Sequence, residues 1–135
     1  MIAVLLVDDH TYIRLGVRSL LEPVPDMEVV DSASNGIEAV AKARSLQPDV
    51  AVIDISMPLM NGMEAIRQIA ACCQRTRILA LSLHHHSEYI RGALEAGASG
   101  YVLKDAIGDE LIEAIRSLYS GKRYFSRKIA DLVPT

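Results

Sequence analysis

Short runs of apolar residues alternate along this chain with segments whose apolar residues recur at helical spacing. The runs cover residues 2–7, 50–53, 78–81 and 101–103, and each is followed by a stretch with a period near 3.6. Uninterrupted apolar runs of this length are typical of strands that are buried on both faces, as in the middle of a parallel sheet. Their strict alternation with amphipathic helices predicts an α/β domain, a doubly wound parallel sheet with helices on both faces.

One further run, residues 27–31, has the length of a strand but carries acids among its apolar residues. This polarity suits the edge of a sheet rather than its centre. With the second strand at an edge, five strand–helix units favour the flavodoxin-like (βα)5 order 2-1-3-4-5. That order makes strands one and three neighbours, at the switch point where ligands bind in such sheets. The chain of 135 residues is long enough for one such domain.

Two of the predicted helices begin with the same four-residue pattern. The runs Asn35-Gly36-Ile37-Glu38 and Asn61-Gly62-Met63-Glu64 each offer an asparagine cap and a glutamate three residues later, as in a capping box. An Asn-Gly pair can also mark a hairpin, but the helical spacing that follows both pairs argues against one. In the first of these helices, Ile37, Val40 and Ala41 are predicted to form the apolar face.

Polar side chains follow the strands of this predicted sheet, at the point where each strand leaves the core. Asp8 and Asp9 follow the first strand, and Asp54 follows the third. Ser82 and Lys104 end the fourth and fifth strands. Because the carboxyl ends of parallel strands lie along one edge of a sheet, the three acids should converge, with the serine and the lysine beside them.

The converging acids indicate a particular chemistry. Three carboxylates held together repel one another and need a cation at neutral pH. The predicted ligands are all oxygens, with no histidine or cysteine nearby, which indicates Mg²⁺ rather than zinc. A carboxylate such as Asp54 can also be a nucleophile that forms an aspartyl-phosphate. Lys104 offers a compact charge and Ser82 a hydroxyl for phosphoryl oxygens, which suits phosphoryl transfer.

The net charge and the cysteines argue against several other classes of site. The formal net charge is −3 and no basic stripe is present, so the chain is a poor candidate for binding nucleic acid by itself. No apolar run approaches the roughly 18 residues that cross a bilayer, which predicts a cytoplasmic protein with no membrane partner. Cys72 and Cys73 are adjacent, so neither a disulfide nor a zinc site is indicated, and free thiols near a helix end are expected.

Taken in their order, these motifs resemble the receiver domain of two-component response regulators, the CheY-like domains. The matching segments are Val7-Asp8-Asp9-His10, the run from Val52 to Pro58 with Asn61-Gly62, Leu81-Ser82, and the run from Ala96 to Asp105. The resemblance implies that Asp54 accepts a phosphoryl group from a sensor histidine kinase. It also implies that Asp9, Asp54 and the main-chain carbonyl of Ser56 bind Mg²⁺ directly, while Asp8 acts partly through water.

Further roles follow from the same resemblance. Ser82 would be the switch hydroxyl, Lys104 would contact the phosphoryl group, and Tyr101 would be the aromatic residue whose rotamer reports the state. Ser56 and His84 match the pair of positions that tunes the rate of dephosphorylation. Such a domain is a switch that assists its own phosphorylation and dephosphorylation, and it is not a turnover enzyme.

The subfamily is indicated by three segments. Asp8-Asp9-His10, Lys104-Asp105-Ala106 and the run from Gly121 to Ser126 resemble regulators of the NarL/FixJ/LuxR type. In that subfamily we expect residues 1–121 to be the receiver, and residues 122–135 to begin a linker to a C-terminal helix-turn-helix domain that this chain lacks. The resemblance implies a homodimer on phosphorylation, control of transcription, and contact with DNA only through the absent domain.

Other classes of function remain open at this point. A stand-alone receiver would act by protein docking, without a DNA-binding domain. An aspartate-nucleophile phosphatase usually has a second acid two residues after the nucleophile, where this chain has Ser56. A flavin-binding domain would need a phosphate loop after the first strand, where this chain has acids. The run His84-His85-His86 is interpreted as a surface loop rather than a metal tract.

Overall fold

A computed structural model describes residues 1–57 and 60–134, so Pro58 and Thr135 lie outside the described residues. Strands and helices alternate along it, as the apolar runs predict. The main elements are β1 (Ile2–Val7), α1 (Thr11–Leu21), β2 (Met27–Ala33), α2 (Gly36–Leu46), β3 (Val50–Asp54), α3 (Gly62–Cys72), β4 (Arg77–Ser82), α4 (Ser87–Ala96), β5 (Gly100–Leu103), α5 (Ile107–Tyr119) and β6 (Tyr124–Phe125). Short 3-10 helices, η1 (Lys104–Ala106) and η2 (Arg127–Leu132), follow β5 and β6. Among these described elements, no helix is both long and apolar enough to cross a membrane.

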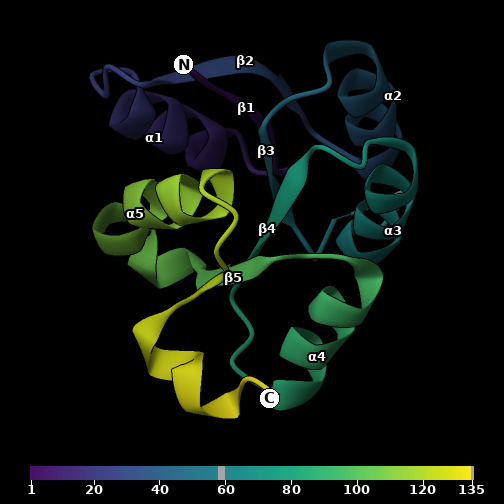
Figure 1. Cartoon of the computed structure of the whole chain (residues 1–135), viewed down its shortest axis with the longest axis vertical. Coiled ribbons are helices and arrows are strands. Elements are labelled where there is room, and N and C mark those ends of the chain that lie inside the picture. The colour runs from purple at the N-terminus through teal and green to yellow at the C-terminus, as the bar shows by residue number, and fades with distance from the viewer. Residues whose placement is uncertain (58–59, 135) are drawn as a thin grey trace.

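All the strands belong to one parallel sheet, in the order β2-β1-β3-β4-β5-β6 (Figure 1). The predicted order 2-1-3-4-5 is confirmed, with the polar strand β2 at an edge and one further strand beyond β5. In the pair β1 and β3, Val7 lies opposite Ile53. The next residue along each chain is therefore an acid, Asp8 in one case and Asp54 in the other, at the same edge of the sheet.

Helices cover both faces of the sheet. The pair α1 and α5 lies on one face, and α2, α3 and α4 lie on the other (Figure 1). Alternate residues of the central strands serve the two layers: Leu5 and Ile53 pack toward α2–α4, whereas Leu6 and Val52 pack toward α1 and α5. Because both faces are buried, these strands show a continuous apolar run instead of an apolar–polar alternation.

The helices α2 and α3 begin where the Asn-Gly pairs predict. The side-chain oxygen of Asn35 accepts a hydrogen bond from the Glu38 N–H (2.9 Å), and Asn61 caps α3 in the same way. The Glu38 carboxylate accepts a bond from the Ser34 N–H (3.2 Å). The glutamate therefore returns a bond to the residue before the cap, one position earlier than in the predicted capping box.

The apolar face predicted for α2 is wrong at two of its three positions. Ile37 and Ala41 are exposed, and only Val40 is buried as expected. The buried face is completed by small residues, chiefly Ala39 and Ala43, which are fully buried. Small side chains let a helix lie close to its neighbours, so here the inward face is not the one with the largest aliphatic residue.

A sixth strand follows α5, and the apolar pattern did not predict it. β6 runs parallel to β5, with Phe125 opposite Tyr101. The buried Ser126 binds β5 twice: its N–H donates to the Tyr101 carbonyl (2.9 Å), and its Oγ accepts from the Leu103 N–H (3.0 Å). Ile129 of η2 is buried in the layer that α2–α4 cover. The segment predicted to begin a linker therefore includes a strand and a short helix that pack on the domain.

Gly62, the first residue of α3, is pressed against the end of β3. A Cβ at this position would overlap the Asp54 carbonyl oxygen and the Ile55 Cα, both backbone atoms. Gly62→Ala should therefore lower the free energy of unfolding in urea by about 3 kcal/mol or more. Gly16→Ala is the matched control, because nothing lies within 4 Å of a Cβ there. The control should raise stability by up to about 1 kcal/mol, and equal effects of the two changes would contradict this packing.

Candidate functional site

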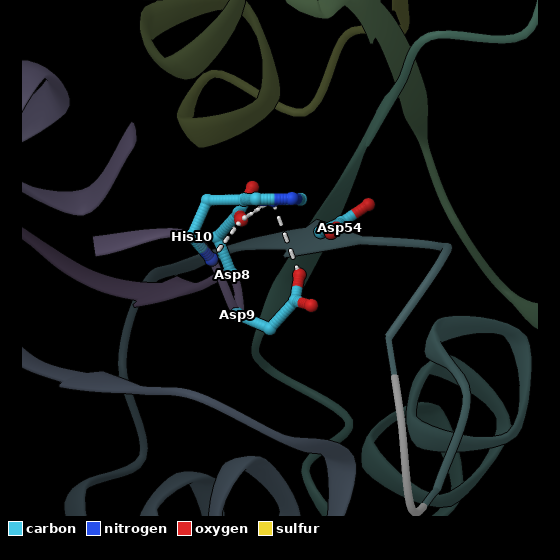
Figure 2. A group of neighbouring side chains, drawn as sticks. All are labelled: Asp8, Asp9, His10 and Asp54. Carbon is cyan, nitrogen blue, oxygen red and sulfur yellow. Dashed lines mark hydrogen bonds and ion pairs between the residues drawn. The ribbon is translucent and has the colours of Figure 1, made fainter. Parts of the chain in front are cut away.

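Asp8, Asp9 and Asp54 meet at the carboxyl ends of β1 and β3, as the strand order predicts (Figure 2). One carboxylate oxygen of each acid, together with one ring nitrogen of His10, lies within 4.8 Å of all the others. Asp8 and Asp54 are fully buried, whereas the Asp9 side chain is 28% exposed. Like charges this close are stable only with compensating positive charge or with shared protons.

Lys104 supplies a positive charge from the end of β5. Its Nζ lies 3.0 Å from Asp8 Oδ2 and 3.2 Å from Asp54 Oδ2, and its side chain is only 7% exposed. Burial alone would lower the pKa of the Lys104 ammonium, but the two carboxylates outweigh burial and raise the pKa. The lysine is therefore charged at neutral pH and links the two buried acids.

The environment of the Asp54 carboxyl has opposing effects on its acidity. Burial raises the pKa of Asp54, the Ser56 N–H lowers it, the Asp8 charge raises it and Lys104 lowers it, and the net direction is upward. The Ser56 N–H donates to Asp54 Oδ1 at 3.0 Å. One oxygen of this carboxyl is thus held by the main chain, while the other lies toward the lysine.

Each of the three acids keeps one buried oxygen that receives no well-directed hydrogen bond from the described residues: Asp8 Oδ2, Asp9 Oδ1 and Asp54 Oδ2. Lys104 and His10 lie at ion-pair distance from these oxygens, but their N–H groups are not aligned with them. Buried acceptors without donors are costly, and a hard divalent cation satisfies several carboxylate oxygens at once. The acidic cluster could therefore hold a metal ion with the preferences of Mg²⁺.

His10 lies beside the acids, so the expectation of a site without a nearby histidine is wrong. Its Nδ1 lies 3.0 Å from Asp8 Oδ1 and 3.2 Å from Asp9 Oδ1 (Figure 2). The Asp8 Oδ1 also accepts the main-chain N–H of His10 at 2.8 Å, so the chain turns back on itself as it leaves β1. The sequence places His10 directly after the two acids, but it is the turn with Asp8 that brings the His10 ring onto them.

Ser82 and Tyr101 are linked through the backbone of His84. The Ser82 Oγ accepts the His84 N–H at 2.8 Å, and the Tyr101 hydroxyl donates to the His84 carbonyl at 2.9 Å. Tyr101 is fully buried, and this burial raises the pKa of its phenol. Within the described residues, no hydrogen bond joins either side chain to the three acids. Both side chains are thus bound to the backbone of one residue, His84, in the segment between β4 and α4.

A small cavity of about 100 Å³ opens beside Asp54. It is lined by His10, Asp54, Ser56, Leu83, His84 and Lys104. The Ser56 Oγ lies 3.4 Å from His84 Nε2, and the His84 ring stacks on Tyr89 with centroids 4.0 Å apart. The cavity has room for roughly three water molecules, or for one small group of similar size.

Comparisons with known proteins agree with this fold. The model of the response regulator receiver domain matches residues 4–116. Response regulator UvrY of Escherichia coli (strain K12) is 43% identical over 131 residues, which cover 97% of this chain and 60% of UvrY. The nitrate/nitrite response regulator protein NarL of the same strain is 36% identical over 130 residues, which cover 96% of this chain and 60% of NarL.

A solved structure is similar over almost its whole length. It is a two-component response regulator of the LuxR family from Aurantimonas sp. SI85-9A1, with 38% identity and a TM-score of 0.93, and the match covers 98% of this chain and 95% of that one. This chain belongs to the receiver domains of two-component response regulators. Its relatives are of the NarL/FixJ/LuxR type, which confirms the predicted subfamily. The chain spans about 60% of the length of UvrY and NarL.

The raised pKa of Asp54 makes stability depend on pH with a known sign. The folded protein keeps this proton to a higher pH than the unfolded chain, so stability falls as pH rises from 3.8 through the folded-state pKa. Asp54→Asn removes that loss. In EDTA at pH 7 the free energy of unfolding of the variant should exceed that of the wild type by about 1 kcal/mol or more. The difference should vanish as pH falls toward 3.8.

The matched control for this experiment has the opposite sign. A hydrogen bond from Arg116 lowers the pKa of the exposed Asp26, so Asp26→Asn should lose stability near neutral pH and lose none in acid. Urea titrations at several pH values measure both effects. A neutral-pH loss in Asp54→Asn as well would show that burial does not dominate the Asp54 environment.

Proposed function

We propose that this chain is a phosphorylation-controlled switch that accepts a phosphoryl group on Asp54 from a sensor histidine kinase. The observation that carries the proposal is the contact of Lys104 Nζ with both Asp8 (3.0 Å) and Asp54 (3.2 Å), at the sheet edge where the acids meet. A nucleophilic carboxylate, a fixed cation and a small adjoining cavity are the parts that phosphoryl transfer requires. A domain of this kind holds a state and does not turn over substrate.

Mg²⁺ is the proposed cofactor. The buried oxygens without aligned donors support this, because hard oxygen ligands are the ones that Mg²⁺ prefers. Asp9, Asp54 and the main-chain carbonyl of Ser56 would bind the ion directly, and Asp8 would act partly through water. When bound, the ion neutralises charge on the phosphoryl oxygens and on the acids. His10 adds a nitrogen near the same oxygens, and in the proposed arrangement it remains a hydrogen-bond partner of Asp8 and stays close to Asp9.

The proposed transfer is a direct displacement at phosphorus. A carboxylate oxygen of Asp54 forms a new O–P bond while the N–P bond of the kinase phosphohistidine breaks, and the electron pair of that bond stays on the imidazole nitrogen. The Ser56 N–H holds Asp54 Oδ1 at 3.0 Å, which limits rotation of the nucleophile. Lys104 places its charge next to the position that the phosphoryl oxygens would occupy. Its charge would therefore stabilise the transition state more than the ground state.

The proposed switch uses the backbone of His84. Ser82 Oγ accepts the His84 N–H at 2.8 Å, and the Tyr101 hydroxyl donates to the His84 carbonyl at 2.9 Å. If Ser82 turns to donate to a phosphoryl oxygen, it releases the His84 N–H, and the segment that Tyr101 holds from its other side is free to adjust. A hydrogen bond to a charged group is worth about 1.5–3 kcal/mol, which shifts a two-state equilibrium roughly 10- to 150-fold.

Ser56 and His84 are proposed to tune the lifetime of the phosphorylated state. Their side chains lie 3.4 Å apart and line the cavity beside Asp54. Stacking on Tyr89 holds the His84 ring in this position. Hydrolysis needs a water molecule in line with the O–P bond, so the two side chains would set how readily water reaches the phosphorus atom.

The output is proposed to be control of transcription. UvrY and NarL are response regulators, and each extends well beyond the part that this chain matches. Residues 122–135 would begin the linker to a helix-turn-helix domain, DNA would be contacted through that domain alone, and phosphorylation would favour a homodimer. The alternative, a stand-alone receiver that acts by docking, differs in having no such domain in the gene.

The phosphoacceptor can be identified by mass. Wild-type protein incubated with acetyl phosphate and Mg²⁺ should gain one phosphoryl group, and Asp54→Asn should gain none. Asp105→Asn is the matched control, because this exposed acid is next to Lys104 in sequence and pairs with Lys128 at the surface. The control should be phosphorylated like the wild type. A phosphoryl gain in Asp54→Asn would move the acceptor elsewhere, and EDTA should abolish the gain if the proposed cofactor is correct.

The switch can be tested through dimerisation. With beryllium trifluoride as a phosphoryl mimic and Mg²⁺, light scattering after size exclusion should show a shift from monomer toward dimer. Tyr101→Phe removes the bond to the His84 carbonyl and should change the dimer dissociation constant about three- to tenfold, the value of one neutral hydrogen bond. Tyr119→Phe alters an exposed tyrosine and should have no effect. Equal behaviour of the two variants would remove Tyr101 from the switch.

A further inference from the structure

Cys72 and Cys73 lie at the opposite end of the sheet from the acids. Cys72 is the last residue of α3, and Cys73 follows as its C-cap. The Cys73 carbonyl accepts the Thr76 N–H at 3.0 Å, and the Thr76 hydroxyl donates to the carbonyl of Pro48, just before β3, at 2.7 Å. The pair is therefore fixed near the amino ends of β3 and β4, whereas Asp54 ends β3 on the far side.

The two thiols point at each other. Their sulfur atoms are 3.0 Å apart, and both cysteines are free. Cys72 is half-buried, while Cys73 is 1% exposed and packs in the core layer of α2–α4. The Gln47 side-chain amide donates to the Cys73 sulfur at 3.6 Å, so the inner sulfur also has a polar neighbour just after α2. The fold thus presents two converging sulfur atoms, one of which solvent can reach.

The acidities of the two thiols differ. Burial by itself would raise the pKa of Cys72, but the hydrogen bond with Cys73 and the Arg44 guanidinium outweigh burial and lower it. Burial raises the pKa of Cys73 to about 11, and the neighbouring Cys72 adds to this. The accessible sulfur is therefore the better nucleophile, and the inner one keeps its proton until a partner displaces it.

Backbone geometry disfavours a direct bond between these sulfurs. Consecutive Cα atoms are about 3.8 Å apart across a trans peptide, whereas disulfides usually span roughly 4.4–6.8 Å between Cα atoms. A bridge through one additional atom relieves that constraint. A structural zinc site usually has four protein ligands. Among the described residues, the side chains that are grouped closely enough to hold a metal ion are Asp8, Asp9, His10 and Asp54, and this group does not include the cysteines.

We propose that Cys72 and Cys73 form a chelating dithiol site for a soft, thiophilic trivalent metalloid, of the class of arsenic(III). Soft thiolate ligands favour soft centres, and arsenic(III) with one organic substituent needs two sulfur ligands. With phenylarsine oxide, each sulfur forms one As–S bond, and the two thiol protons leave with the arsenic-bound oxygen as one water molecule. No oxidation state changes. This site is independent of the phosphoacceptor proposal, since it shares no residue with it.

The test uses the whole chain and phenylarsine oxide as the probe. Native mass spectrometry of the wild type should show one adduct per chain, with loss of one water. The adduct should survive an excess of a monothiol such as glutathione and be removed by a dithiol. Cys73→Ala removes the inner sulfur and leaves the accessible thiol of Cys72, which can still form one As–S bond. Its adduct should be stripped at a roughly 100-fold lower monothiol concentration, because the second As–S bond then no longer forms intramolecularly.

Two comparisons make the proposal falsifiable. Release of the arsenical from wild type and from Cys73→Ala at the same glutathione concentration would overturn the chelate. Adduct formation by the wild type only after unfolding in urea would overturn the preformed site, because any Cys-Cys segment binds once it is released from the fold. Iodoacetamide provides an independent measurement: Cys72 should be alkylated before Cys73, and the reverse order would contradict the assigned geometry. Asp54→Asn should bind the arsenical like the wild type, which separates this result from the phosphoacceptor test.

Discussion

The contact of one lysine with two buried carboxylates is the interaction on which this molecule depends. Asp8 and Asp54 are removed from water, and their charges would repel strongly without Lys104 between them. Burying ions is expensive, and their mutual attraction repays the expense only with good geometry and further hydrogen bonds. Here the oxygens are only partly satisfied, so the arrangement is a poor choice for stability alone. The unpartnered carboxylate oxygens leave the site able to accept additional positive charge, as the proposed function requires.

The sheet order is what makes this contact possible. β1 and β3 are neighbours because the chain crosses over between them, and their register brings Asp8 and Asp54 to one edge. Lys104 follows β5, two strands away from β3, so only a long side chain reaches the acids from there. The first residue of α3, Gly62, lies against the Asp54 carbonyl, so the start of this helix packs directly on the end of β3. The contact between Lys104 and the acids therefore depends first on the order of the strands and then on the length of the lysine side chain.

The sequence predicted most of this arrangement because strand burial and strand ends leave clear patterns. Period and polarity were sufficient for the strand order and for the convergence of the acids with Lys104. They failed at Ile37, because the inward face of α2 is made of alanines whose small size leaves no hydrophobic signal. They also failed at Tyr124–Phe125, because a two-residue strand has no period. The position of His10 depends on a local turn, which apolar patterns do not describe.

The sixth strand changes the character of the sheet at its far side. Without it, β5 would present a free row of backbone donors and acceptors beside Tyr101, and such rows invite pairing with other chains. Because β6 and Ser126 pair with β5, β5 is an interior strand. The edge of the sheet is then β6, whose two residues are too few to pair stably with another chain. The opposite edge strand, β2, carries the charged residues Glu28 and Asp31, which disfavour pairing with another chain. Both borders of the sheet are thereby protected against uncontrolled growth by strand pairing.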